Sequence, residues 1–146
     1  MSTLHMALRD AVAAALKAGP ALADGGVKEG RRRPMPQAVE RQVFVDLDES
    51  PAAPTTMGQF VEWSTRVRVE CIARSTPGLP ADDVADEMLA IAYGRVMADP
   101  RLGGKALDTN PAGMAWRIEE EAETGIAGCA ALFTVRHRTP RASVAA

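Results

Sequence analysis

The side chains of this sequence that most often hold metals or carry catalysis are two histidines and two cysteines. His5 and His137 lie near opposite ends of the chain, and Cys71 and Cys129 are far apart. Zinc sites need ligands at short spacings such as CxxC, HxxxH or HExxH, and none of these occurs here. Both cysteines share the alternation of apolar residues in a predicted strand, which favours packed thiols in the core. We therefore expect no metal and no cofactor.

A run of glutamates within residues 119–123 could offer a carboxylate pair for general acid–base catalysis. Such catalysis needs a concave, partly desolvated site, and nothing in the neighbouring sequence predicts one. The alternative is a solvated strand face, whose glutamates pair with Arg136 and Arg138 on the next strand or with arginines of another subunit. We favour the second interpretation and do not expect an enzyme.

The sequence also lacks the usual phosphate-binding and nucleophile motifs. Gly103, Gly104 and Lys105 do not form a P-loop, because the leading glycine is absent and Ala106 replaces the hydroxyl residue. No GxSxG nucleophile elbow occurs either. The glycine pair is better interpreted as a turn.

Arg31, Arg32 and Arg33 form the most conspicuous charged cluster. Three guanidinium groups can bind DNA phosphates, bind the carboxylates of a partner, or remain solvated in a loop. The chain has 17 basic and 19 acidic residues, a net charge of −2, and no aromatic residues interleaved with the arginines for base stacking. Contact with a partner or a second subunit is therefore favoured over DNA.

The composition is typical of a globular protein with a hydrophobic core. The chain has 146 residues, of which 47% are hydrophobic and 25% charged. This length predicts a single domain over 1–146, in which 139–146 form a frayed tail. We find no apolar run long enough for a membrane span and no secretory signal, and two cysteines suit a reducing compartment.

Hydrophobic periodicity predicts two helices and several strands. Apolar residues recur every four positions over 3–18, and helical spacing returns over about 81–98, with Val84, Met88, Ile91 or Ala92, and Val96 facing inward. Strict alternation predicts strands over 42–48, 59–74 and 126–138, with another around Met114, Trp116 and Ile118. Short extended pieces are expected around Val27 and Met35–Val39, and mobile loops over 49–58 and 99–111.

The expected fold class is therefore α+β: two helices packed on one face of a mostly antiparallel sheet. The strand over 59–74 carries the strongest signal. Its apolar residues occupy one parity and its charged residues the other, with Ile72 as the exception, which is typical of a sheet with one buried and one solvated face.

The order of these segments resembles the tail terminator proteins of long-tailed bacteriophages, the family that includes the lambda minor tail protein U. The resemblance covers roughly residues 3–139 and rests on the order of the segments rather than on a strict motif. The segments are LHMALRDAVAAALKA, VKEGRRRPMP, VFVDLDESPAAP, WSTRVRVECIARS, DDVADEMLAIAYGRVMADPRLGG and WRIEEEAETGIAGCAALFTVRHRT.

The resemblance implies a structural virion protein without catalysis or cofactor. Proteins of this family form a hexameric ring that caps the tail tube, stops its polymerisation and joins the tail to the head connector. The implied partners are further copies of the chain, the major tail tube protein and the connector or neck proteins, with the tape measure protein as another candidate. DNA would pass through the ring lumen without specific binding, and no membrane is involved. The implied location is the phage neck, assembled in the host cytoplasm. The alternative is a head-completion or neck adaptor protein.

A ring needs two different surfaces that fit one another, and opposite charges would set their register. The alternative is that these charges pair inside one subunit. The interface candidates are Arg31, Arg32, Arg33, Arg66, Arg68, Arg74, Glu119, Glu121 and Glu123. The candidate loop contacts with the tube or connector are Glu49, Thr55, Thr56, Arg101, Lys105 and Asp108.

Overall fold

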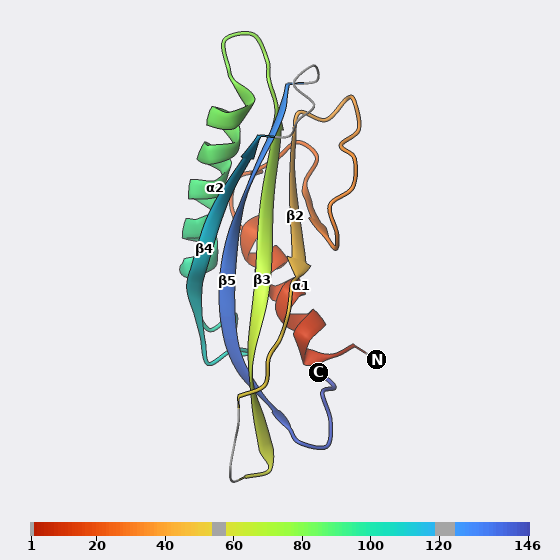
Figure 1. Cartoon of the computed structure of the whole chain (residues 1–146), viewed down its shortest axis with the longest axis vertical. Coiled ribbons are helices and arrows are strands. Elements are labelled where there is room, and N and C mark those ends of the chain that lie inside the picture. Colours follow the sequence, from red (N-terminus) through yellow and green to blue (C-terminus); the bar gives the residue numbers. More distant parts are fainter. Residues whose placement is uncertain (1, 54–57, 119–124) are drawn as a thin grey trace.

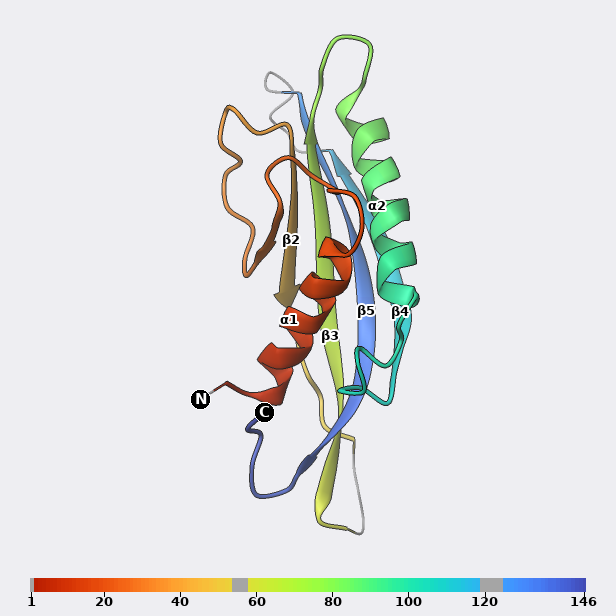
Figure 2. The same cartoon turned by 180° about the vertical axis from the view of Figure 1, so that it is seen from behind.

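The computed structural model describes residues 2–53, 58–118 and 125–146, and it has the expected α+β architecture. Five strands form one sheet in the order β1-β2-β3-β5-β4. Only β1 and β2 run parallel, and the other neighbours are antiparallel. Both helices lie on the same face of the sheet (Figure 1 and Figure 2). The elements are α1 (Leu4–Lys17), β1 (Val27–Glu29), β2 (Arg41–Leu47), β3 (Phe60–Arg74), α2 (Ala81–Met97), β4 (Asp108–Ile118) and β5 (Ile126–Pro140).

The long strands β3 and β5 form the centre of the sheet. Each has 15 residues, and they pair along their whole length from Phe60 with Pro140 to Arg74 with Ile126. The residues of one parity are buried under the helices, as the alternation predicts. Phe133 of β5 is fully buried there and stacks on Tyr93 of α2, with ring centroids 5.8 Å apart.

The helices bury the faces that their periodicity predicts. The hydroxyl oxygen of Thr3 accepts a hydrogen bond from the Met6 amide and caps α1, whose buried side includes Leu8 and Leu16. In α2 the inward position is Ala92, while Ile91 is 49% exposed. The side chains of Asp82 and Asp83 lie in the first turn of α2, where the helix dipole favours negative charge.

The predicted loop over 99–111 is too long, because β4 begins at Asp108. Residues 108–111 pair with β5, and the register shifts between Pro111 and Gly113. Pro111 is tolerated because β4 is an edge strand, where a missing amide donor breaks no bond to a further strand. Because proline is rare in strands, Pro111 led the sequence pattern to predict a loop where β4 begins.

The first part of the predicted connector over 49–58 lies along β3, and residues 54–57 lie outside the described residues. The amide of Arg66 donates to the carbonyl of Glu49 at 2.7 Å, and the amide of Ala53 donates to that of Glu62 at 2.8 Å. Residues 49–53 therefore continue alongside β3 and are not a free loop.

Two further segments differ from expectation. No strand forms over Met35–Val39, where Pro34 and Pro36 lack amide donors, and the arginine cluster lies in the loop after β1. At the other end of the chain, Thr139 and Pro140 belong to β5. The Leu4 amide donates to the Val144 carbonyl at 2.8 Å, so the last residues lie beside the first (Figure 1).

Replacing Phe133 by alanine should lower the free energy of unfolding by about 3–5 kcal/mol, because it removes a fully buried ring and leaves a cavity. Phe60→Ala is the matched control, since Phe60 is 56% exposed and its loss should change stability by less than about 0.5 kcal/mol. Urea unfolding followed by circular dichroism measures both. Equal effects of the two substitutions would contradict the assignment of the core.

Candidate interaction surfaces

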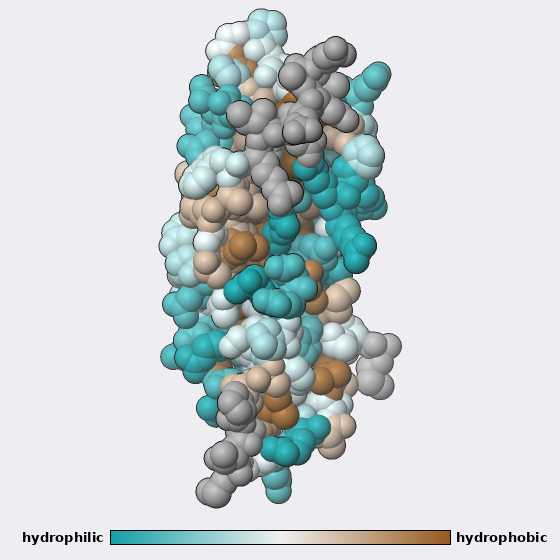
Figure 3. Space-filling view, in the orientation of Figure 1, coloured by the Kyte–Doolittle hydropathy of each residue, from teal (hydrophilic) through white to brown (hydrophobic). Residues whose placement is uncertain are grey.

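The face of the sheet that carries no helix is predominantly polar. It presents the charged parity of β3, including Arg66, Arg68 and Glu70, next to Arg136 and Arg138 of β5. Figure 3 shows this face, with hydrophilic residues gathered across its middle. We call it the open face.

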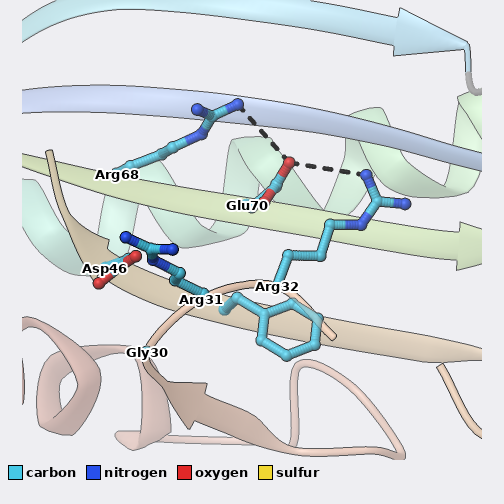
Figure 4. A pocket seen from close by; sticks show the side chains of 7 residues that line it. Gly30, Arg31, Arg32, Asp46, Arg68 and Glu70 are labelled. Atoms are coloured by element: carbon cyan, nitrogen blue, oxygen red, sulfur yellow. Dashed lines mark ion pairs between the residues drawn. The ribbon is translucent and has the colours of Figure 1, made fainter. Parts of the chain in front are cut away.

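Glu70 is the centre of one charged group on the open face. Its Oε1 atom lies 3.6 Å from Nη2 of Arg68 and 3.8 Å from Nη1 of Arg32 (Figure 4). One carboxylate thus balances only part of the charge of two guanidinium groups. The Nε atom of Arg68 is buried and forms no hydrogen bond with any residue that the structure describes.

A second group of ion pairs joins three strands. Arg136 of β5 lies 3.1 Å from Glu62 of β3 and 3.1 Å from Asp108 of β4. Arg138 lies 4.0 Å from the same oxygen of Glu62. Asp108 is therefore the first residue of β4 and pairs within the subunit, and it does not lie in a loop as predicted.

Two other candidate arginines also have partners inside the subunit. Arg66 pairs with Glu49 at 3.3 Å, so the structure joins a predicted interface residue to a predicted loop residue. Arg74 donates to the carbonyls of Val39 and Pro36, both at 3.4 Å, and so holds the segment before β2. Arg66 and Arg68 thus form ion pairs within the subunit, as in the alternative prediction, whereas Arg74 is bound by backbone carbonyls.

The open face has a hollow beside Glu70, and the volume of this hollow is about 310 Å³. Gly30 has a positive φ of 108°, and its amide donates to the Val45 carbonyl, which turns the arginine loop over β2. Arg31 points toward Asp46 in Figure 4. Arg31 and Arg33 are exposed, and neither forms an ion pair with a described residue. The hollow is lined by Gly30, Arg31, Arg32, Phe44, Asp46, Arg68 and Glu70.

The remaining loop candidates lie at the helix side of the molecule. Arg101 and Lys105 are exposed in the turn after α2, which is anchored by the buried side chain of Leu102. Asp99 stabilises this turn by accepting a hydrogen bond from the Gly103 amide at 2.8 Å. Thr55, Thr56, Glu119, Glu121 and Glu123 lie outside the described residues.

Both cysteines are buried, as predicted, and face one another across β3 and β5. Cys71 is fully buried, and Cys129 donates to the Ala85 carbonyl at 3.1 Å. Burial raises the pKa of both thiols, that of Cys129 to about 11. A thiol with a raised pKa is a poor nucleophile and a poor metal ligand at neutral pH.

A buried polar cluster, which the sequence did not predict, lies between α1 and the sheet. Nε2 of His137 lies 2.6 Å from the Thr65 hydroxyl, which lies 2.6 Å from that of Ser50. The ring of His5 packs edge-on against His137 and Trp63. The parity of His137, shared with Val135 and Phe133, was a signal that it is buried.

This cluster is poorly suited to catalysis. His137 is fully buried, and its Nδ1 atom has no hydrogen-bond partner among the residues described. Desolvation, with a smaller contribution from His5, lowers the pKa of His137 to about 4. A neutral imidazole without an orienting carboxylate and without access to solvent cannot transfer protons to a substrate.

Within the described ranges, no group of three histidine, cysteine or acidic side chains lies close enough to hold a metal ion. Nor does either described helix have the length and hydropathy needed to cross a bilayer.

The arrangement of helices and strands has a counterpart among solved structures. It is similar to a chain from the virion of a native gene transfer agent (GTA) particle, with a TM-score of 0.64 and 16% sequence identity. The match covers 90% of this chain and 95% of that chain. At this identity the similarity concerns the fold. No protein-family model and no curated protein matches the sequence.

The low pKa of His137 predicts a loss of stability in mild acid. Because the unfolded histidine has a pKa of about 6.5, the unfolded state binds a proton first. The contribution of His137 to the free energy of unfolding should be complete above about pH 7 and fall by about 2 kcal/mol between about pH 7 and 5. The loss should level off below about pH 4, where both states are protonated.

Urea midpoints across this pH range measure the effect. His137→Asn removes the titrating ring, and its unfolding free energy should change much less over the same range. An equally steep loss in this variant would assign the effect to other groups. His5, whose pKa burial also lowers, would be the next group to test.

Proposed function

We propose that this protein is a structural component of a phage-like virion, and specifically a tail terminator. In this role six copies form a ring at the end of the tail tube, stop its polymerisation and provide the surface that meets the head connector. The proposed location is the neck of the particle, and assembly would occur in the host cytoplasm.

The observation that carries the proposal is the near-complete overlap in fold with a chain of a gene transfer agent virion. The overlap includes 90% of one chain and 95% of the other, so no large addition distinguishes them. The sequence resemblance to tail terminators points in the same direction, because its segments correspond in order to α1, β2, β3, α2 and the β4–β5 pair.

The described surfaces favour binding over turnover. The open face carries paired charges and a shallow hollow, whereas the one histidine with a strongly lowered pKa is fully buried. Assembly onto other proteins needs register and charge complementarity, which rigid sheets with fixed ion pairs supply. We therefore assign the protein a role without catalysis.

The partners in this proposal are other copies of the chain, the tail tube protein and the connector. Arg101 and Lys105 project from the turn after α2 and are our candidate contacts with the tube or connector. The exposed parts of Arg66 and Arg68 are candidates within the ring, since their side chains are 40% and 32% exposed despite their ion pairs.

The test is to polymerise the cognate tail tube protein with and without this protein and to image the products by electron microscopy. We expect a ring of six subunits at one end of each tube and a halt in growth at that end. Tubes of unchanged length without a terminal ring would contradict the proposal. Binding to DNA-filled heads and not to tubes would instead identify a neck adaptor.

A further inference from the structure

We propose that copies of this chain join head to tail, with a tryptophan-centred patch of one copy seated in the arginine-rimmed hollow of the next. The inference rests on the proposed ring and names the two surfaces that would build it. We call the first surface the Trp116 patch: Trp116 and Met114 of β4 with Asp82, Asp83 and Asp86 of α2. The second is the hollow beside Glu70.

Trp116 is the most exposed large apolar side chain that the structure describes. It is 62% exposed, and Met114 on the same face of β4 is 42% exposed. Neither is covered, because β4 lies at the sheet edge and α2 packs mainly over β3 and β5. An exposed tryptophan beside a second apolar side chain is typical of the centre of a protein interface.

The indole is already held in one orientation. Its Nε1 donates to Asp86 Oδ1 at 2.9 Å, which ties β4 to α2. A fixed aromatic side chain loses little conformational entropy on binding. This bond also leaves the ring face available, since it uses only the edge that carries the nitrogen.

The Trp116 patch carries negative charge. Asp82 and Asp83 precede Asp86 by four and three residues, so they lie near it on the helix surface. No described residue forms an ion pair with any of the three. A basic surface would therefore meet three carboxylates without an ion-pair partner among the described residues, of which Asp86 also accepts the indole hydrogen bond.

The hollow has the complementary properties. Arg31 lines the hollow and supplies positive charge without a described ion-pair partner (Figure 4). Its neighbour Arg33 is exposed and likewise has no described ion-pair partner. Phe44, which is 3% exposed, contributes to the floor of the hollow. The hollow's volume of about 310 Å³ lies at the lower end of the range for small-molecule pockets, about 300–1,000 Å³, and suits one aromatic side chain. Guanidinium groups at its rim can also stack on an indole.

The two surfaces lie at opposite ends of the strand order. The Trp116 patch is at the β4 edge, and the arginine loop follows β1 at the other edge (Figure 1). Each copy thus offers one of each surface to different neighbours. This arrangement is heterologous, and it forms a ring when the rotation between neighbours closes. The chain's net charge of −2 favours a protein occupant over DNA.

The test uses two variants of the full chain and sedimentation velocity over a wide range of concentration. The first variant carries Trp116→Ala and Asp83→Arg and lacks the Trp116 patch. The second variant carries Arg31→Glu and Arg33→Glu and lacks the positive charge beside the hollow. Each variant alone should associate at least about 30-fold more weakly than the unchanged protein. An equimolar mixture should form dimers and nothing larger, because one intact patch meets one intact hollow and no further contact remains.

Phe60→Ala and Arg141→Glu are matched controls, since both residues are exposed and lie outside the two surfaces. They should associate like the unchanged protein, and circular dichroism should show all variants folded. Rings that persist in both double variants would overturn this inference and leave the proposed function standing.

Two other outcomes would also overturn it. One is an unchanged protein that stays monomeric at every concentration, and the proposed function would then rest on the tail-tube experiment alone. The other is an Arg31→Glu, Arg33→Glu variant that loses binding to duplex DNA while its self-association is unaffected, which would assign the arginines to DNA.

Discussion

The structure depends on the pairing of β3 with β5 along 15 residues. Because strand side chains alternate between faces, a single register decides which residues lie under the helices and which face outward. A shift of one residue would put Arg66 and Arg68 into the core and Val67 and Val69 on the surface. The apolar parity in both strands therefore fixes the register, and the charged open face follows from it.

The charged side chains of the open face connect neighbouring strands within the subunit. Glu62, Asp108 and Arg136 join three neighbouring strands, and Glu70 holds Arg68 next to the arginine loop. Partly exposed ion pairs of this kind contribute little stability individually. Their effect is to hold long side chains in fixed positions, so the surface has a defined pattern of charge.

The strongest predictions from sequence were those in which local pattern and tertiary environment agree. The alternation over β3 and the four-residue repeat of α1 set their faces correctly, because both elements bury one side against a large core. The sequence pattern gave wrong predictions for β4, which lies at the edge of the sheet. Pro111 concealed the beginning of β4, and Trp116 is exposed because α2 packs mainly over β3 and β5.

The candidate site was less predictable than the fold. The arginine cluster was visible as a run of like residues, but the hollow beside it requires the long-range approach of the β1 loop to β3. The contact of Trp116 with Asp86 joins residues 30 positions apart and has no local signature. His137 was considered as a ligand, whereas its parity with Phe133 already placed it in the core.

The pairing between the two ends of the chain has a practical consequence. The Ala146 amide donates to the Ser2 carbonyl at 3.1 Å, so both termini leave the fold at one corner. Chains whose ends meet in this way tolerate circular permutation, in which a short linker closes the old ends and new ones open in an exposed turn. An affinity tag or fluorescent label could thus be moved from that corner to the other end of the sheet without lengthening the polypeptide appreciably.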